Sequence, residues 1–404
     1  MTDEAAARRD RVLLASVVFA VLFAQVLLYP GYPELVDALG AGSVLSGGMW
    51  FLAAEFGAFV AFASVWGAAS DALGRRAPLI RLGAVGGAVG YGLLAVVVAS
   101  GVAGFGVALV LRVAQGAATI GAFSLAMTML MDLPGGHGRN MGAAGIAIGL
   151  GTALGAPIGG VLTGVDPVAP LVAAGAVLVL VGGLSTLVPE RGVGGGREGV
   201  REVLGELADV PALLVPYTFG FVDRLSAGFF ALVGTAYFRR EAGFALGAAE
   251  TGLVLALFFA PFALLQYPFG ALSDRIGRLV PVGGGSVLYG LAVAAVGLAP
   301  TLGAAGAAMF AVGVVGAFMA PATMALVTDV APANRRGTAM GGFNIFGSLG
   351  FLGGIIVGGW LATRYGYLVA FLVAGGLEIA IAVVALPVLV GIAPELTVPF
   401  GDGE

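Results

Sequence analysis

The stretch Gly67-Ala68-Ala69-Ser70-Asp71-Ala72-Leu73-Gly74-Arg75-Arg76 has a close counterpart later in the chain, Gly270-Ala271-Leu272-Ser273-Asp274-Arg275-Ile276-Gly277-Arg278. Both copies read G-x-x-x-D-x-x-G-R, they lie 203 residues apart, and each follows a hydrophobic stretch. Chance is a poor explanation for identities in register within a chain that is otherwise mostly Ala, Gly, Val and Leu. The repeat therefore predicts a duplicated membrane unit with one stereotyped turn in each half.

The composition places the chain in a bilayer. Of its 404 residues, 59% are hydrophobic and only 10% are charged, and the mean hydropathy is +1.04. A soluble domain of this length needs more charged surface than that. The chain has no cysteine and a single histidine, His137, so we expect neither disulfides nor a metal site. No basic patch for nucleic acid is present.

Apolar stretches long enough to cross a bilayer occur twelve times. A hydrocarbon core of about 30 Å needs roughly 20 apolar residues per helix. The predicted spans are 12 to 33, 47 to 69, 78 to 99, 104 to 131, 142 to 163, 169 to 188, 212 to 238, 249 to 271, 280 to 299, 303 to 328, 338 to 362 and 367 to 391. The first span lacks a small-residue cleavage site, so we interpret it as a retained helix rather than a signal peptide.

The positions of the arginines predict the orientation, because positive residues in short loops stay on the cytoplasmic side. All 19 basic residues are arginines. With the N-terminus inside, the loops and termini that face the cytoplasm hold fourteen of them, and only Arg239, Arg240 and Arg364 fall outside. We therefore expect both termini and both copies of the repeated turn to be cytoplasmic, in a multi-pass protein of the cell membrane.

A polar segment separates the two halves. Residues 189 to 211 contain Pro189, Glu190 and a run of three glycines at 194 to 196, followed by a charged stretch. Within that stretch apolar residues recur at helical spacing from Val200 to Val210, which predicts a short helix at the membrane surface. The glycines follow no strand and precede no Lys-Ser/Thr pair, so they do not form a phosphate loop. The predicted domains are residues 1–188 and 212–404, joined by the cytoplasmic linker 189–211.

A second trace of the duplication is a set of glycines in the fifth and eleventh spans. The fifth span contains Gly142, Gly151, Gly155, Gly159 and Gly160. With a constant offset of 199 these map onto the glycines of the eleventh span, Gly341, Gly350, Gly354, Gly358 and Gly359. Small residues four apart let helix backbones approach closely in lipid. We expect these glycines to pack helices tightly, and to do so between halves that slide or rock.

Together these patterns resemble the major facilitator superfamily over nearly the whole chain. The repeated turn resembles that family's motif after the second and eighth spans, and Arg112-Val113-Ala114-Gln115-Gly116 resembles its R-x-x-Q-G motif. Residues 151 to 160 are similar to the G-x-x-x-G-P-x-x-G-G stretch of proton-coupled exporters. Pro157 lies one position later than in that stretch, and Ala72 stands where the family has a basic residue.

The resemblance implies an all-α fold of two pseudo-symmetric six-helix bundles, here with twelve spans. It also implies that the turn cluster latches the cytoplasmic side while the cavity faces outward. The residues of that gate are Gly67, Asp71, Gly74, Arg75, Arg76, Asp132, Gly270, Asp274, Arg275, Gly277 and Arg278. The corresponding packing motif comprises Gly151, Gly155, Pro157, Gly159 and Gly160.

Ionisable residues inside the spans are costly unless they are paired or wet, and they mark candidate pathways. Glu55 and Arg112 lie at similar depth, about 10 to 12 Å from the outer face, at a rise of 1.5 Å per residue. An ion pair between them is geometrically possible, and Gln25 falls at the same depth. Because Arg112, Gln115 and Thr119 share one helical face, we expect that face to line the central cavity.

A second set lies near the midplane of the later spans. Asp223 and Arg224 are in the seventh span and Glu378 is in the twelfth. Adjacent helical residues point about 100° apart, so we expect only one of Asp223 and Arg224 to face the cavity. Pairing of Arg224 with Glu378 is the most natural arrangement. Glu55 and Asp223 are the candidates for a carboxylate that changes protonation during transport, whereas Gln25 does not titrate.

These features lead to one main hypothesis, a secondary active transporter that exports small hydrophobic or amphipathic compounds in exchange for protons by alternating access. The alternative is a proton- or sodium-coupled uptake symporter for a small metabolite. An enzyme acting on lipids would need a nucleophile with its base, or a metal cluster, and the sequence offers neither. We expect no cofactor, no nucleic-acid partner, and a monomer in the lipid bilayer.

Overall fold

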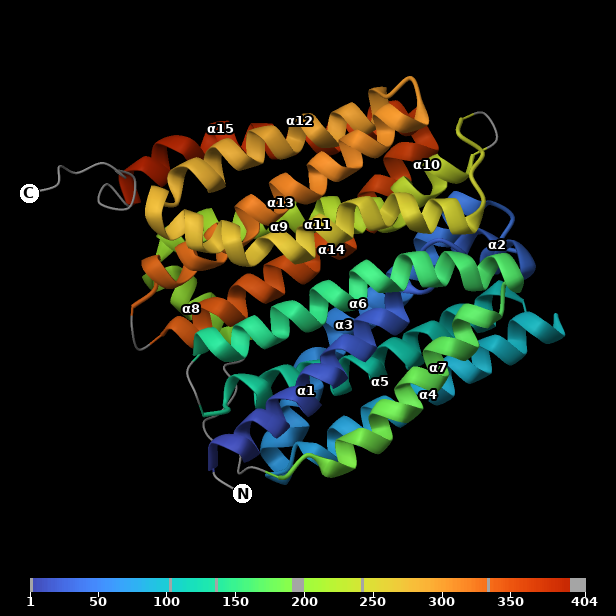
Figure 1. Ribbon diagram of the computed structural model, residues 1–404, viewed down its shortest axis with the longest axis horizontal. Coiled ribbons are helices and arrows are strands. Elements are labelled where there is room, and N and C mark those ends of the chain that lie inside the picture. Colours follow the sequence, from blue (N-terminus) through green and yellow to red (C-terminus); the bar gives the residue numbers. More distant parts are fainter. Residues whose placement is uncertain are drawn as a thin grey trace, which may run out of the picture. The chain divides into compact units, whose positions relative to one another are not determined.

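The computed structural model describes residues 3–101, 104–134, 137–190, 200–240, 243–332 and 335–392. Within these residues all regular structure is helical, and no strand occurs (Figure 1). The glycine run at 194 to 196 and the side chain of His137 lie outside the described part.

The helices follow one another with short connections. In the first part of the chain they are α1 (Asp3–Val26), α2 (Tyr32–Ala38), α3 (Val44–Leu73), α4 (Ala77–Ser100), α5 (Phe105–Met131), α6 (His137–Val165), α7 (Ala169–Leu184) and η1 (Ser185–Leu187). In the second part they are α8 (Val200–Asp209), η2 (Pro211–Leu213), α9 (Leu214–Phe229), η3 (Phe230–Gly234), α10 (Thr235–Arg239), α11 (Ala248–Ile276), η4 (Val280–Gly284), α12 (Gly285–Leu298), α13 (Leu302–Val330), α14 (Arg336–Tyr365) and α15 (Tyr367–Ile392).

Eleven helical segments of the described residues are long and apolar enough to cross a membrane. They coincide with the second to twelfth predicted spans. The first predicted span, 12 to 33, is not among them, because α1 ends at Val26 and turns occupy residues 27–31. Charged residues occupy the start of α1, up to Arg11, so its uninterrupted apolar part is shorter than that of the other spans.

The repeated turn has a simple backbone explanation. Helix α3 ends at Gly74, whose φ is +62°, and α11 is followed by Gly277, whose φ is +82°. Left-handed backbone is accessible to glycine without steric cost and commonly ends a helix. The shared glycine of the two copies therefore stops one helix and reverses the chain toward the next, α4 or the η4–α12 segment.

By its internal contacts the chain divides into two compact units. Unit 1 comprises Met1–Arg197 and Thr235–Ala256, and unit 2 comprises Glu198–Gly234 and Leu257–Glu404. Residues 235–256, which the repeat assigns to the second half, thus pack with unit 1. Glycines allow this packing, since a Cβ at Gly160 would overlap the Ala248 carbonyl and one at Gly252 would overlap the Ala156 carbonyl.

The repeated glycines bring two pairs of helices together, each within its own unit. In unit 1, Gly151 and Gly159 of α6 lie against the carbonyls of Phe19 and Leu27 around the end of α1. In unit 2, Gly350 and Gly354 of α14 lie against the carbonyls of Phe221 and Leu225 of α9. The tight packing is as expected. These four glycines hold helices within a predicted half, whereas Gly160 of the same set packs α6 against Ala248, which belongs to the predicted second half 212–404.

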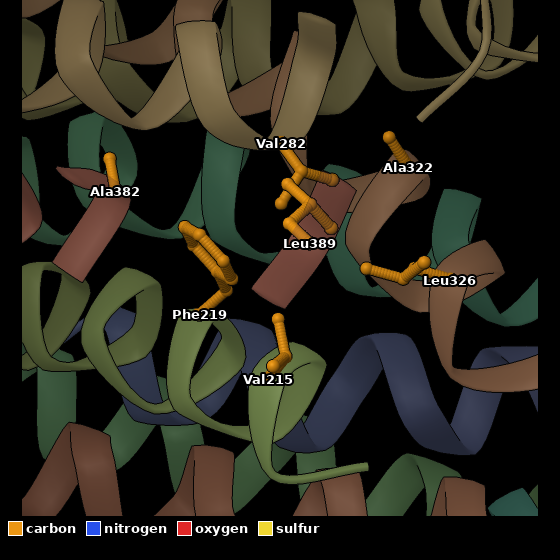
Figure 2. Close-up of a cluster of buried hydrophobic side chains, with 7 residues drawn as sticks. All are labelled: Val215, Phe219, Val282, Ala322, Leu326, Ala382 and Leu389. Carbon is orange, nitrogen blue, oxygen red and sulfur yellow. The ribbon is translucent and has the colours of Figure 1, made fainter. Parts of the chain in front are cut away.

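Unit 2 contains a compact apolar core. Figure 2 shows Val215 and Phe219 of α9 opposite Leu389 of α15 and Val282 of η4, with α13 completing the cluster. A second cluster centres on Leu213 and Tyr217, and Leu207 and Val210 pack against it. The short helix predicted in the linker is therefore present as α8, and its apolar side contacts protein.

Candidate functional site

Unit 1 contains a fully enclosed polar cluster. An ion pair joins Arg112 Nη2 of α5 to Glu55 Oε2 of α3, and both side chains have zero exposure. Arg112 Nη1 donates to Gln115 Oε1 at 2.6 Å. Gln115 Nε2 donates to Glu55 Oε1 at 3.1 Å and to Thr119 Oγ1 at 2.8 Å. The ion pair considered from depth alone is thus present, and hydrogen bonds along one face of α5 extend it.

Tyr91 of α4 closes this cluster, and the sequence reasoning missed it. Its hydroxyl donates to Glu55 Oε1 at 3.4 Å, and its ring centroid lies 5.8 Å from the Arg112 guanidinium carbon. The ring of Phe51 stacks on the same guanidinium at 4.5 Å. A local signal was available, because Tyr91-Gly92-Leu93 recurs as Tyr289-Gly290-Leu291 in the corresponding span of the second half.

Glycines make room for the cluster. A Cβ at Gly116 would lie 2.8 Å from the Glu55 carbonyl oxygen, and one at Gly87 would lie 2.8 Å from Thr119 Oγ1. Helices α3, α4 and α5 therefore approach closely enough to enclose the ion pair completely. This corrects the expectation that the Arg112, Gln115 and Thr119 face lines a cavity, since these side chains are at most 1% exposed.

Gln25 of α1 is also buried, with 2% exposure. Its Nε2 has no hydrogen-bond partner within the described residues, so Gln25 is not part of the Glu55 network. Tyr29, in the turn after α1, is the residue of this region whose hydroxyl lies within electrostatic range of Glu55, Tyr91 and Arg112. Gln25 and Glu55 therefore form no hydrogen bond with each other, although they lie at similar depth.

Unit 2 arranges its ionisable residues differently from the prediction. Ser226 Oγ of α9 donates to Glu378 Oε1 of α15 at 3.3 Å, and both side chains have zero exposure. Arg224 Nη2 donates to Asn344 Oδ1 of α14 at 3.4 Å, and its guanidinium carbon lies 5.8 Å from the Phe343 ring centroid. The predicted Arg224–Glu378 pair is therefore wrong.

Helical geometry explains this correction. Ser226 follows Arg224 by two residues, which is a rotation of about 200° around α9. Because Ser226 faces α15, Arg224 points to the opposite side and reaches α14. Asp223, which precedes Arg224, is half-buried and makes neither a hydrogen bond nor an ion pair within the described residues.

The first copy of the repeated turn is joined to α5 by its second arginine, Arg76. Arg76 Nη1 lies 2.5 Å from Asp132 Oδ2 just after α5, and the Arg76 side chain is 5% exposed. Arg75, which we expected to join Asp132 in the latch, is exposed instead. The physical reason is the turn itself, since Gly74 redirects the chain and Arg76 becomes the buried residue at the start of α4.

Glu190 adds a contact that the sequence did not predict. Its two carboxylate oxygens accept hydrogen bonds from the backbone N–H groups of Arg76 at 2.8 Å and Ala77 at 3.1 Å. A carboxylate at a helix N-terminus satisfies unpaired donors and complements the helix dipole. Glu190, near the start of the linker 189–211, is thus attached to the repeated turn.

In the second copy, the arginine at the motif position forms the bridge. Arg278 lies 2.7 Å from Asp274, 3.1 Å from Asp329 near the end of α13, and 2.5 Å from Ser273 Oγ. Arg275 is exposed. Each repeat therefore connects its turn to the end of an adjacent helix through one arginine–aspartate pair, Arg76–Asp132 or Arg278–Asp329. The first glycines of the two copies, Gly67 and Gly270, lie about one helical turn before Asp71 and Asp274, within α3 and α11.

Within the described residues, no group of three histidine, aspartate or glutamate side chains is placed to hold a metal ion. The buried polar groups described above are carboxylates inside membrane-spanning helices, one in an ion pair (Glu55) and others without one (Asp223 and Glu378).

Comparison with known proteins identifies transporters and a multidrug resistance protein among the relatives. Over 169 residues the chain is 32% identical to an uncharacterised MFS-type transporter of Methanocaldococcus jannaschii, which is 41% of this chain and 42% of that protein. It is 31% identical to the niacin transporter NiaP of Acinetobacter baylyi over 38% of this chain and 34% of that protein. It is also 31% identical to the multidrug resistance protein MdtG of Serratia proteamaculans, over 34% of this chain and 33% of that protein.

These matches cover less than half the length of each relative. Over its whole length the fold is similar to the crystal structure of the human organic anion transporter MFSD10, with a TM-score of 0.67 and 20% sequence identity. That similarity covers 93% of this chain and 99% of the other, and at this identity it concerns the fold alone.

The Major Facilitator Superfamily model matches residues 14–238 and 219–400, which together span most of the sequence. With this match, the all-helical fold and its membrane-spanning helices, the chain belongs to the Major Facilitator Superfamily of multi-pass membrane transporters.

Proposed function

We propose that this protein is a secondary active transporter that exports small hydrophobic or amphipathic organic compounds in exchange for protons, by alternating access. It acts in the cell membrane as a monomer with both termini in the cytoplasm, the orientation that the arginine distribution favours.

The observation that supports proton coupling is that the buried acid of unit 1 forms an ion pair, whereas the acids of unit 2 do not. Glu55 is neutralised by Arg112 in an enclosed ion pair. Neither Asp223 nor Glu378 forms an ion pair within the described residues, although both lie in membrane-spanning helices. The cation within electrostatic range of Asp223 is its chain neighbour Arg224, which donates its hydrogen bond to Asn344. An acid at this depth without a paired cation is retained at a cost, and changing its protonation is the chemistry that a proton-coupled transporter requires.

Export is supported by the similarity to MdtG, a multidrug resistance protein, and by the glycine stretch of α6. That stretch resembles the exporter pattern and seats α6 directly on the backbone of α1. Membrane-spanning helices that are mostly apolar and carry few polar groups suit amphipathic organic compounds better than sugars. In this proposal the unpaired acids Asp223 and Glu378 serve the proton pathway, and the Glu55–Arg112 cluster keeps α3, α4 and α5 together.

The cytoplasmic turns form the gate in this proposal. Arg76–Asp132 and Arg278–Asp329 tie each turn to the end of a neighbouring helix within its own unit. Asp71 and Asp274 begin the two turns, and Glu190 holds the start of α4. Loosening these contacts favours the conformation that opens to the cytoplasm.

Oriented vesicles with a pH gradient of known sign test the direction. In inverted vesicles with an acidic lumen, export predicts that ethidium, an amphipathic cation, accumulates in the lumen as protons leave it. The accumulation is abolished when the gradient is dissipated. Absence of gradient-driven movement of ethidium and of nicotinate in both vesicle orientations contradicts proton-coupled transport.

The second candidate is uptake of a small metabolite by symport, which the similarity to the niacin transporter favours. It predicts that nicotinate accumulates in right-side-out vesicles when protons or sodium ions flow inward. The sign of the gradient that drives accumulation separates the two candidates, since export requires opposite movement of proton and substrate.

A further inference from the structure

Glu378 occupies an unusual environment near the middle of α15. Its side chain has zero exposure, Oε1 accepts the hydrogen bond from Ser226, and Oε2 has no hydrogen-bond partner within the described residues. An ionised carboxylate with one bare oxygen in an enclosed apolar site is costly, whereas the neutral acid is tolerated.

The helices packed against α15 near Glu378 provide no cation for it. They are α9, α12, η4 and α14. The titratable groups that face Glu378 are Asp223 of α9 and Tyr289 of α12, which is 1% exposed and lies beside Ser226. Arg224 is turned toward Asn344, the charged residues of α14 are at its ends, Arg336 and Arg364, and η4 has none.

Close packing encloses the acid. A Cβ at Gly290 of α12 would overlap the Gly375 carbonyl of α15 and would lie 3.1 Å from Glu378 Cβ. A Cβ at Gly375 would in turn overlap the Gly290 carbonyl. The backbones of α12 and α15 therefore meet at the level of Glu378, which leaves the half-buried Asp223 side as the more open approach to the acid.

We propose that Glu378 is the residue that binds and releases the coupling proton, with Asp223 as the acid that exchanges it. This assignment rests on the proposed function. In the described conformation Glu378 is a neutral carboxylic acid with its proton on Oε2. When the proton is released, that O–H bond breaks, Glu378 becomes a carboxylate and the Asp223 carboxylate becomes the acid. Ser226, and Tyr289 beside it, position the Glu378 carboxyl group.

Infrared spectroscopy of the purified protein in lipid tests the assignment without a substrate. At neutral pH the exposed acids are ionised, so wild type retains the C=O band of a buried carboxylic acid. We expect this band to be lost in Glu378→Gln and to disappear from wild type as the pH is raised. Glu250→Gln, at an exposed glutamate of α11, is the matched control and keeps the band.

Ser226→Ala extends the test to a protein whose carboxyl groups are all intact. Ser226 donates to Glu378, and a donor favours the ionised form, so its loss moves the midpoint of the band's titration to higher pH. This result is informative even where Glu378→Gln fails to fold. An identical band in wild type and folded Glu378→Gln overturns the assignment, as does a band that persists to alkaline pH or an unchanged midpoint in Ser226→Ala.

Transport separates this inference from the proposed function. For one coupled proton, a gradient of about one pH unit supports roughly tenfold accumulation. Glu378→Gln is expected to reduce gradient-driven ethidium accumulation to none, whereas the control Glu250→Gln, at an exposed residue, accumulates ethidium to the wild-type level. Coupled transport in Glu378→Gln refutes the proton assignment alone. A titrating Glu378 band in a wild type that shows no gradient-driven transport refutes the proposed function and leaves the proton-binding group in place.

Discussion

Replacing Arg112 with methionine removes the guanidinium that neutralises Glu55. The variant also loses the 2.6 Å hydrogen bond to Gln115 and the stacking on Phe51. Glu55 then retains Gln115 Nε2 at 3.1 Å and the Tyr91 hydroxyl at 3.4 Å, both neutral donors. Because the pair has zero exposure, solvent does not screen the remaining charge, and removing one partner of such a pair costs roughly 3 to 5 kcal/mol.

The free energy of unfolding in lipid bicelles, measured by denaturant titration, is the assay. The double variant Glu55→Gln/Arg112→Met leaves no charge behind, and its amide still reaches Tyr91 and Gln115. We expect it to recover most of the loss, to within about 2 kcal/mol of wild type. Arg364→Met, at an exposed arginine at the end of α14, is the matched control and changes stability by about 0.5 kcal/mol or less.

The stabilities of these variants together show whether Glu55 and Arg112 depend on each other. An Arg112→Met loss no larger than that of Arg364→Met refutes the argument that the ion pair is a buried, mutually dependent unit. A double variant less stable than Arg112→Met refutes the electrostatic part of the argument, because the cost then arises from packing rather than from an unpaired carboxylate.

Three further substitutions test the packing and the cytoplasmic turn by the same unfolding measurement. Gly354→Ala places a Cβ against the Leu225 carbonyl and is expected to lower the free energy of unfolding by about 1 to 3 kcal/mol. Gly341→Ala, the control on the same helix, meets no atom within 4 Å and is expected to be neutral or stabilising. Equal effects of the two substitutions contradict the close approach of α14 and α9. Asp132→Asn costs up to about 1 kcal/mol, because Asp132 is 50% exposed, and a loss that does not shrink in high salt argues against a charge effect. Glu190→Gln keeps an acceptor for α4 but loses the charge, and is expected to cost roughly 0.3 to 1 kcal/mol; no change refutes the helix-dipole contribution.

The fold was predictable because membrane helices leave strong one-dimensional signals. Apolar length marked every later span, and the repeated glycine marked the place where the chain must adopt positive φ, at Gly74 and Gly277. The first span was harder, since charged residues up to Arg11 interrupt α1 and turns follow Val26. The repeat did not predict that residues 235–256 pack with unit 1, because this packing depends on which glycine of one helix lies against the backbone of another.

The sequence predicted how deep each site residue lies along its helix, but not toward which neighbouring helix its side chain points. Depth along the helices correctly brought Glu55 and Arg112 together, since rise per residue is constant. The direction in which each face points depends on helix rotation, which sequence does not specify without a partner. For that reason the Arg112 face proved enclosed, Arg224 faced α14 rather than Glu378, and Arg76 took the place expected of Arg75.

The central claim is a duplicated unit whose two turns lie on the same, cytoplasmic side of the membrane, and cysteine labelling tests it most directly. The chain has no native cysteine, so single cysteines can be introduced without background. The matched positions are Ala72→Cys and Arg275→Cys, both exposed and 203 residues apart, with Ser100→Cys as the position expected outside. A membrane-impermeant maleimide is expected to label the two turns only from the cytoplasmic face and Ser100→Cys only from the outside. Labelling of the two turns from opposite faces contradicts the duplication on which the fold, the gate and the proposed transport all depend.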